Sequence, residues 1–215
     1  MAVKKASDVR VYFGTYDFST ASVSVSVNLE AEVLDPTVFT DAAERATAGI
    51  RRDTIEWAGL FDDGTSADAA GSALAGGTGN VLSVAIGTTT GDRAYCGTNY
   101  LLGAKAVGNI GELVRQEVAL VPDGTWIMAK HFGGIRSRTG TASDASGSLD
   151  DGTGTTGTHY FVSHVFSLTI ATGTLTVRLS HNPDGTGFQV KAEHLYTTVG
   201  SQITALTGTL GSLVR

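Results

Sequence analysis

The chain is poor in cysteine, proline and charge. Of its 215 residues, one is cysteine (Cys96), three are proline, and 17% are charged. A single cysteine excludes an intramolecular disulfide and a cysteine-rich metal site, and it permits folding in a reducing cytoplasm. The hydrophobic fraction of 41% is too high for a wholly disordered chain. Glycine lacks the three-residue period of collagen.

Long apolar runs and an excess of positive charge are also missing. No stretch approaches the roughly 18 consecutive apolar residues of a transmembrane helix, so no membrane segment is expected. No apolar run follows Lys4 and Lys5, so we expect no ordinary secretory leader. The net charge of −6 argues against a dedicated nucleic-acid binder, whose affinity would rest on Lys and Arg at phosphates.

Sequence motifs for catalysis and metal binding are absent as well. The chain contains no Gly-x-Ser-x-Gly elbow, no P-loop and no His-Glu-x-x-His. Paired acids at 62–63 and 150–151 precede Gly-Thr and are interpreted as solvated turn residues, with a cation site as the alternative. Cys96 is interpreted as a buried, inert thiol. The histidines lie on separate predicted strands, except for two that would point to opposite faces of one strand: His131, His159, His164, His181 and His194. We therefore predict no enzyme, no cofactor and no metal.

Glycine and alternating apolar residues dominate what is present. Glycine accounts for 28 residues, about twice the average usage. The strongest periodic signal spans Ser22 to Leu34 and predicts a long strand with one dry and one wet face. Its predicted dry face consists of Val23, Val25, Val27, Leu29, Ala31 and Val33. A second alternating strand is predicted over 53–61. The residues on one side of it are Ile55, Trp57, Gly59 and Phe61.

Two short helices and further strands complete the expected elements. Residues 40–48 predict a short helix that Gly49 would end, and residues 66–75 predict a second one, weakened by Gly71. Pro122-Asp123-Gly124 predicts a hairpin turn between two strands. The remaining strands are predicted over 9–13, 81–86, 93–102, 112–121, 125–132, 160–170, 175–181, 188–196 and 202–207.

Residues 133–158 have a composition of their own. Apart from Ile135 and Leu149 they consist mainly of Gly, Thr, Ser and Asp, and such a segment buries too little to offset its ordering entropy. We predict a long mobile loop there. The predicted fold is mainly β, a β-sandwich or barrel with one or two short helices and this Gly/Thr/Ser-rich loop. Two domains are predicted, 1–122 and 123–215, with one continuous domain as the alternative.

The segment between the two alternating strands carries a distinctive pattern. Leu34-Asp35-Pro36-Thr37-Val38-Phe39-Thr40-Asp41 is followed by Arg45, by Ala48-Gly49-Ile50-Arg51, and by a strand that ends near Phe61-Asp62-Asp63-Gly64. This pattern resembles the tail tube (major tail) proteins of tailed bacteriophages. The resemblance covers about residues 8–121 and is thinner beyond them. Pro36, Thr40 and Arg52-Asp53-Thr54 depart from the Val, Gly and Asp-Gly that are common in the family. The motif positions, taken as assembly candidates, are Asp35, Thr37, Phe39, Asp41, Arg45, Gly49, Arg51, Trp57 and Phe61.

The resemblance implies a tail-tube-type β-sandwich or barrel that forms hexameric rings, whose stacking builds the tube through which DNA passes. The implied partners are further copies of the chain and the tape-measure, terminator and distal tail proteins, with DNA as a non-specific cargo. The implied location is the virion tail, after assembly in the cytoplasm of the bacterial host. Two alternatives stay open. One is another ring-forming tail component, such as a terminator or distal tail protein. The other is a carbohydrate-binding β-sandwich module of the virion that uses the histidines or Trp126, Tyr160 and Tyr196.

Overall fold

The computed structural model describes a chain made almost entirely of strands, which confirms the mainly β class. It describes residues 6–35, 46–61, 79–109, 112–131, 149–150, 155–169, 173–182, 189–210 and 213–214. A single 3-10 turn, Ala6–Asp8, precedes the strands in this part of the chain. The strands are β1 (Val9–Phe13), β2 (Tyr16–Asp17), β3 (Ser22–Leu34), β4 (Thr47–Leu60), β5 (Asn80–Ile86), β6 (Arg93–Val107), β7 (Arg115–Lys130), β8 (Leu149–Asp150), β9 (Thr155–Val165), β10 (Leu175–Asn182), β11 (Gln189–Tyr196), β12 (Gly200–Leu210) and β13 (Leu213–Val214).

The strands hydrogen-bond into three sheets. A seven-stranded sheet has the order β2-β1-β5-β6-β7-β4-β3, and a four-stranded sheet has the order β11-β10-β13-β8. β12 pairs with β9 along the whole of both strands. The pairs β1–β5, β3–β4, β4–β7, β9–β12 and β10–β11 are all antiparallel.

Contacts divide the chain into two units whose segments alternate along the sequence. Unit 1 comprises Met1–Thr20, Asn80–Cys96 and Ile127–Arg215, and unit 2 comprises Ala21–Gly79 and Gly97–Trp126. β6 and β7 therefore contribute residues to both units. The predicted division at residue 122 stays a prediction. No helix in the part of the chain that the structure describes is long and apolar enough to cross a membrane.

Each unit has its own buried core. In unit 2 the predicted alternation of β4 is confirmed, because Ile55 and Trp57 are buried on one side of the strand. The Trp57 indole Nε1–H donates to Ser22 Oγ at 2.6 Å and so ties β4 to the start of β3. The core of unit 1 is built on β1 and β5, whose buried side chains include Val11, Phe13, Leu82 and Val84.

The predicted hairpin turn at Pro122-Asp123-Gly124 is wrong. β7 runs through it as one strand from Arg115 to Lys130, and Gly124 adopts a φ of +91° inside that strand. β4 pairs with β7 only as far as Leu120, which lies opposite Ile55. Pro122 has no backbone N–H to give to a ladder. The Pro-Asp-Gly sequence therefore follows the end of the β4–β7 ladder instead of reversing the chain.

The predicted helix over 40–48 is wrong at its end, because β4 begins at Thr47 and Gly49 lies inside it. A Cβ on Gly49 would lie 3.0 Å from Leu34 Cγ, so this glycine gives room to a neighbouring side chain. The remainder of that helix falls in 36–45, outside the described residues. The second predicted helix, 66–75, lies outside them as well.

The predicted loop over 133–158 is wrong in its last part. β8 occupies Leu149–Asp150, and β9 begins at Thr155. Residues 155–158 pair with 207–210 of β12. Backbone hydrogen bonds form this ladder whatever the side chains, so the lack of large apolar residues did not prevent a strand. Residues 132–148 and 151–154 lie outside the described part of the chain.

Candidate assembly site

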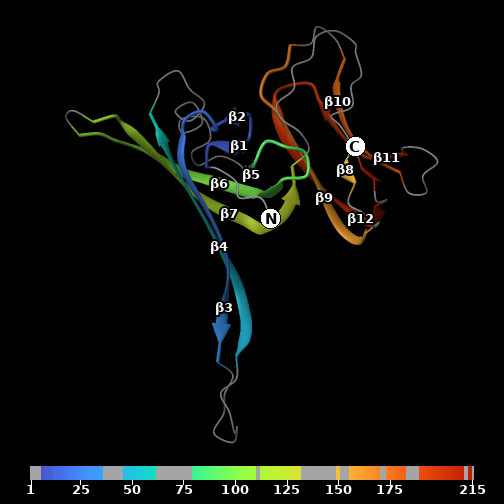
Figure 1. Cartoon of the computed structure of the whole chain (residues 1–215), viewed down its shortest axis with the longest axis horizontal. Coiled ribbons are helices and arrows are strands. Elements are labelled where there is room, and N and C mark those ends of the chain that lie inside the picture. The colour runs from blue at the N-terminus through green and yellow to red at the C-terminus, as the bar shows by residue number, and fades with distance from the viewer. Residues whose placement is uncertain are drawn as a thin grey trace, which may run out of the picture. The chain divides into compact units, whose positions relative to one another are not determined.

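The pairing of β3 with β4 continues beyond the point where β4 leaves β7. β3 and β4 stay paired from Ser22–Gly59 to Leu34–Thr47, while β4 and β7 are paired only between Ile55–Leu120 and Leu60–Arg115. Residues 29–34 and 47–53 thus form a two-stranded ribbon, seen as the blue and cyan strands of Figure 1. β3 is the last strand in the order of its sheet. Its outer edge offers backbone N–H and C=O groups to an incoming strand.

The predicted dry face of β3 is only partly covered. Val25, Val27 and Leu29 are half-buried, but Val23 is 57% exposed and Val33 is 74% exposed. The register with β4 shifts between Ser22 and Ser24 and between Ala31 and Val33. Each shift interrupts the alternation of the neighbouring side chains. In addition, the described β4–β7 ladder ends before the ribbon begins.

Exposed apolar side chains lie close together along the ribbon. Val33 pairs with Ala48, and Ile50 lies two residues further along β4, beside the register shift between Ala31 and Val33. Val33 is 74% and Ile50 76% exposed. We call Val33, Ala48 and Ile50 the ribbon patch. Nearby, Arg52 Nη2 lies 3.3 Å from Glu32 Oε2 across the two strands, in an exposed ion pair.

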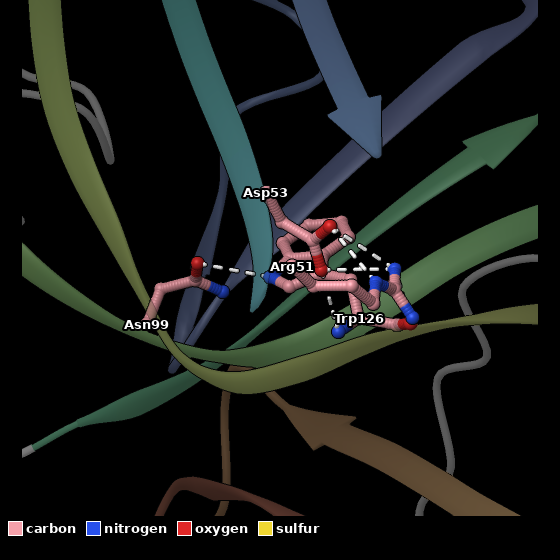
Figure 2. Close-up of polar contacts among 4 residues, drawn as sticks. All are labelled: Arg51, Asp53, Asn99 and Trp126. Carbon is pink, nitrogen blue, oxygen red and sulfur yellow. Dashed lines mark hydrogen bonds and ion pairs between the residues drawn. The ribbon is translucent and has the colours of Figure 1, made fainter. Parts of the chain in front are cut away.

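The base of the ribbon is joined to β7 by side chains where the backbone ladder has stopped. Asp53 Oδ2 accepts a hydrogen bond from the Trp126 backbone N–H at 3.2 Å, and Arg51 Nη2 donates to the Trp126 carbonyl oxygen at 3.3 Å. Arg51 also donates to both carboxylate oxygens of Asp53, at 2.9 and 3.1 Å from Nη2. Figure 2 shows these contacts. We call Arg51, Asp53 and Trp126 the clasp.

The clasp joins a buried residue of β7. The Trp126 side chain is 1% exposed, and its indole Nε1–H donates to Asn99 Oδ1 at 3.1 Å (Figure 2). The buried Asn99 amide donates in turn to the Gly97 carbonyl at 3.0 Å. A Cβ on Gly97 would lie 2.6 Å from Trp126 Cδ1, so only glycine leaves space for the ring.

A hollow of about 540 Å³ lies beside the clasp. Both of its arginines already face carboxylates, Arg51 facing Asp53 and Arg52 facing Glu32. The hollow therefore presents apolar surface together with compensated charge. Its lining residues are Ile50, Arg51, Arg52, Asp53, Val121, Pro122 and Gly124.

The structure brings only some of the assembly candidates to this site. Arg51 belongs to the clasp, and Gly49 lies in the ribbon. Trp57 lies in the core of unit 2, and the backbone N–H of the half-buried Phe61 donates to the Val114 carbonyl at 2.9 Å. Asp35 directly follows β3. The other candidates lie outside the described residues: Thr37, Phe39, Asp41 and Arg45.

Sequence reasoning missed Asp53 as a member of the site. The available signal was its position two residues after Arg51, which places both side chains on the same face of a strand. Nothing in the sequence indicated that Trp126 would meet this pair, because 73 and 75 residues separate Trp126 from Asp53 and Arg51.

The aromatic residues named for a sugar-binding site are mostly buried. Trp126 is 1% and Tyr196 4% exposed, whereas Tyr160 is 44% exposed. A sugar stacks on the open face of a ring, so Trp126 and Tyr196 are excluded from that role in the described fold. The interpretation of Cys96 as a buried thiol is confirmed, because it is 2% exposed and burial raises its pKa to about 12.

His164 joins β9 to the core strands of unit 1. Its Nδ1 lies 3.0 Å from the Gly14 carbonyl oxygen, and its Nε2 lies 2.9 Å from Ser83 Oγ. The ring also packs against Tyr12 and Phe166. Burial lowers the pKa of His164 from 6.5 to about 4, against a smaller opposing effect of the bond to Gly14. The imidazole is therefore neutral at pH 7.

His194 is the centre of a second polar cluster in unit 1. Its Nδ1 lies 2.6 Å from Ser163 Oγ, its Nε2 lies 3.0 Å from Thr204 Oγ1, and Phe161 stacks on the ring. Burial lowers the pKa of His194. Ser163 also lies 2.7 Å from the Tyr196 hydroxyl. The cluster joins β9, β11 and β12 through satisfied polar groups. No group of three metal-ligating side chains gathers anywhere in the described residues.

No family model matches the sequence, and no curated protein matches it. Among solved structures, the chain is similar to a chain of the virion of a native gene transfer agent particle, with 16% identity, coverage of 59% of this chain and 99% of that one, and a TM-score of 0.48. It is similar to a chain of the extended sheath–tube complex of an extracellular contractile injection system, PVC, with 12% identity, coverage of 60% and 93%, and a TM-score of 0.49. A chain of the tube-terminating cap of an anti-feeding prophage gives 12% identity, coverage of 61% and 93%, and a TM-score of 0.49. These TM-scores lie below 0.5, so the likeness carries no conclusion about function.

Proposed function

We propose that the chain is a structural subunit of a bacteriophage tail that assembles with further copies of itself into stacked rings forming the DNA conduit. The pattern of residues 34–64 resembles that of tail tube proteins and therefore indicates the class of assembly. The observation that carries the proposal is the β3–β4 ribbon, with the open edge of β3 and the exposed ribbon patch. Ring formation needs head-to-tail contacts between unlike surfaces, and a protruding apolar ribbon supplies one such surface.

The balance of charge favours a conduit over a DNA-binding protein. The chain carries 15 basic and 21 acidic residues. The described arginines of the ribbon, Arg51 and Arg52, each face a carboxylate. A passage for DNA must not retain phosphates, so compensated arginines and a net negative charge suit it.

The experiment is assembly of the purified chain, followed by negative-stain electron microscopy and sedimentation over a concentration series. Wild type is expected to form rings or tubes of uniform diameter with an open centre, and rotational averages are expected to show six-fold symmetry. Open-ended stacking supports a tube subunit, whereas a single ring indicates a terminator or distal tail protein. A chain that stays monomeric at every concentration would contradict the proposal.

A double variant, Val33→Asp with Ile50→Asp, tests the surface that carries the proposal. Both side chains are exposed in the single chain, so its thermal unfolding temperature should stay near that of wild type while assembly is lost. Leu113→Asp is the matched control, since Leu113 is also 74% exposed but lies outside the ribbon. Equal loss of assembly in the control variant would show that the ribbon patch has no specific role in assembly.

A further inference from the structure

We infer that Arg51 and Asp53 are positioning residues that hold the ribbon to β7 and fix the direction in which the ribbon patch meets a second copy of the chain. The inference rests on the proposed function and assigns a task to two residues at the ribbon base. Neither residue needs to touch the partner for this task.

The ribbon has little backbone support beyond its own two strands. Between residues 53 and 47, β4 has β3 as its described backbone partner, and its ladder with β7 has ended at Ile55. An isolated two-stranded ribbon is marginally stable and is free to bend. A surface that must dock in one orientation therefore needs a second attachment near its base.

Two side chains of β4 attach the base of the ribbon to β7. Asp53 accepts from the Trp126 N–H while Arg51 donates to the Trp126 carbonyl. The two side chains thus take both backbone groups of one β7 residue, the groups that a paired strand would otherwise take. The Asp53 side chain is 3% exposed and the Arg51 side chain 41%. Charge-assisted hydrogen bonds to a buried carboxylate are stronger and more directional than neutral ones.

Trp126, whose backbone bonds to Arg51 and Asp53, is a buried residue of β7. The Trp126 ring is buried and donates a hydrogen bond to Asn99 (Figure 2). It also packs closely against Gly97. Its backbone is consequently held by the core of unit 2. Fixing the ribbon to this residue therefore fixes it to the core of unit 2, and the patch residue Ile50 directly precedes Arg51.

The adjacent arginine provides a matched control. Arg52 forms an ion pair of its own with Glu32, and that pair joins the two strands of the ribbon to each other. The clasp variant is Arg51→Gln with Asp53→Asn, and the control variant is Arg52→Gln with Glu32→Gln. Each variant removes one positive and one negative charge, and both shorten one arginine to glutamine.

The first readout is hydrogen exchange on freshly diluted, unassembled chain. In the clasp variant, exchange of the Trp126 amide and of peptides covering 29–34 and 47–53 should accelerate about tenfold, while the control variant should leave the Trp126 amide near wild type. Peptides from β1 and β5 report whether the fold has survived. Unchanged exchange in the clasp variant would overturn the inference.

The second readout is the concentration at which assembly begins. The clasp variant should need about tenfold more protein than wild type, with a thermal unfolding temperature close to that of the control variant. Assembly at the wild-type concentration would overturn the inference while leaving the proposed function intact. If wild type itself forms no rings, the proposed function fails, and the exchange comparison still decides whether the clasp holds the ribbon.

Discussion

At the scale of single residues, Trp126 contacts several other residues of unit 2 at once. The ring packs against Gly97, and the indole N–H donates to Asn99. The backbone N–H donates to Asp53, and the backbone carbonyl accepts from Arg51. Such a residue serves two purposes. It fills the core of its unit, and it provides a fixed point to which a protruding element can be attached.

His164 leads to a prediction about stability and pH. Its pKa is lowered to about 4 in the folded chain by burial and has its ordinary value of 6.5 when unfolded. Between those values the unfolded chain binds more protons, so the free energy of unfolding should fall as pH drops from about 6.5 to about 4 and level off below. The loss attributable to His164 is about 3 kcal/mol at most. Burial also lowers the pKa of His131 and His194, which act in the same direction.

Urea unfolding between pH 4 and pH 7 measures this loss. His164→Gln should flatten the dependence on pH, and His159→Gln, a half-buried histidine on the same strand, provides the comparison. A slope unchanged by His164→Gln would mean that other groups cause the dependence.

At the scale of elements, β3 and β4 pair residue by residue but differ in how far they are buried. Ile55 is 3% exposed and lies opposite Val27, which is only half-buried. β4 has neighbours on both sides, β3 and β7, whereas β3 ends its sheet. The same alternating pattern therefore builds a core strand in one case and a half-covered edge in the other.

Alanine substitutions at this cross-strand pair test that difference. Ile55→Ala should reduce the free energy of unfolding by about 2–4 kcal/mol because it opens a cavity in a packed site. Val27→Ala should reduce it by less than half as much in the unassembled chain, since solvent already reaches its side chain. Chemical denaturation of both variants at low protein concentration gives the comparison. Equal losses would show that β3 is covered as fully as β4.

At the scale of the whole molecule, the distribution of charge sets the relation to DNA. The net charge is −6, and binding of duplex DNA depends on neutralising phosphates with basic residues. We expect no retardation of duplex DNA by the chain at physiological salt, whether as monomer or as assembled rings. A gel-shift series over salt concentration is the measurement. Tight binding that weakens steeply with salt would contradict the role of a passive conduit.

Several elements follow directly from the order of side chains. The long strand from Ser22 to Leu34 has the predicted bounds, and β5, β10 and β11 lie within one residue of theirs at either end. Ile55 and Trp57 were placed correctly on the buried side of β4. Alternation predicts such features because a strand needs only its own residues to decide which side chains share a face.

Other predictions failed where local chemistry allows two outcomes. Pro122-Asp123-Gly124 suits a tight turn, and it equally suits the end of a ladder within a continuous strand. Gly49 can end a helix or leave room for Leu34. Residues 155–158 carry no large apolar side chains, yet β12 supplies them with a backbone partner. In each case a contact with a segment distant in the sequence determined which structure formed.

The sequence by itself determined the β class, the positions of most described strands and the resemblance of residues 34–64 to tail tube proteins, because these depend on short-range order along the chain. Only the tertiary structure decided that β4 leaves β7 at Ile55, that the ribbon patch is exposed, and that Arg51 and Asp53 close on Trp126. Those features depend on which strands become neighbours. Strand neighbours are selected by burial of the whole core, to which segments far apart in the sequence contribute together.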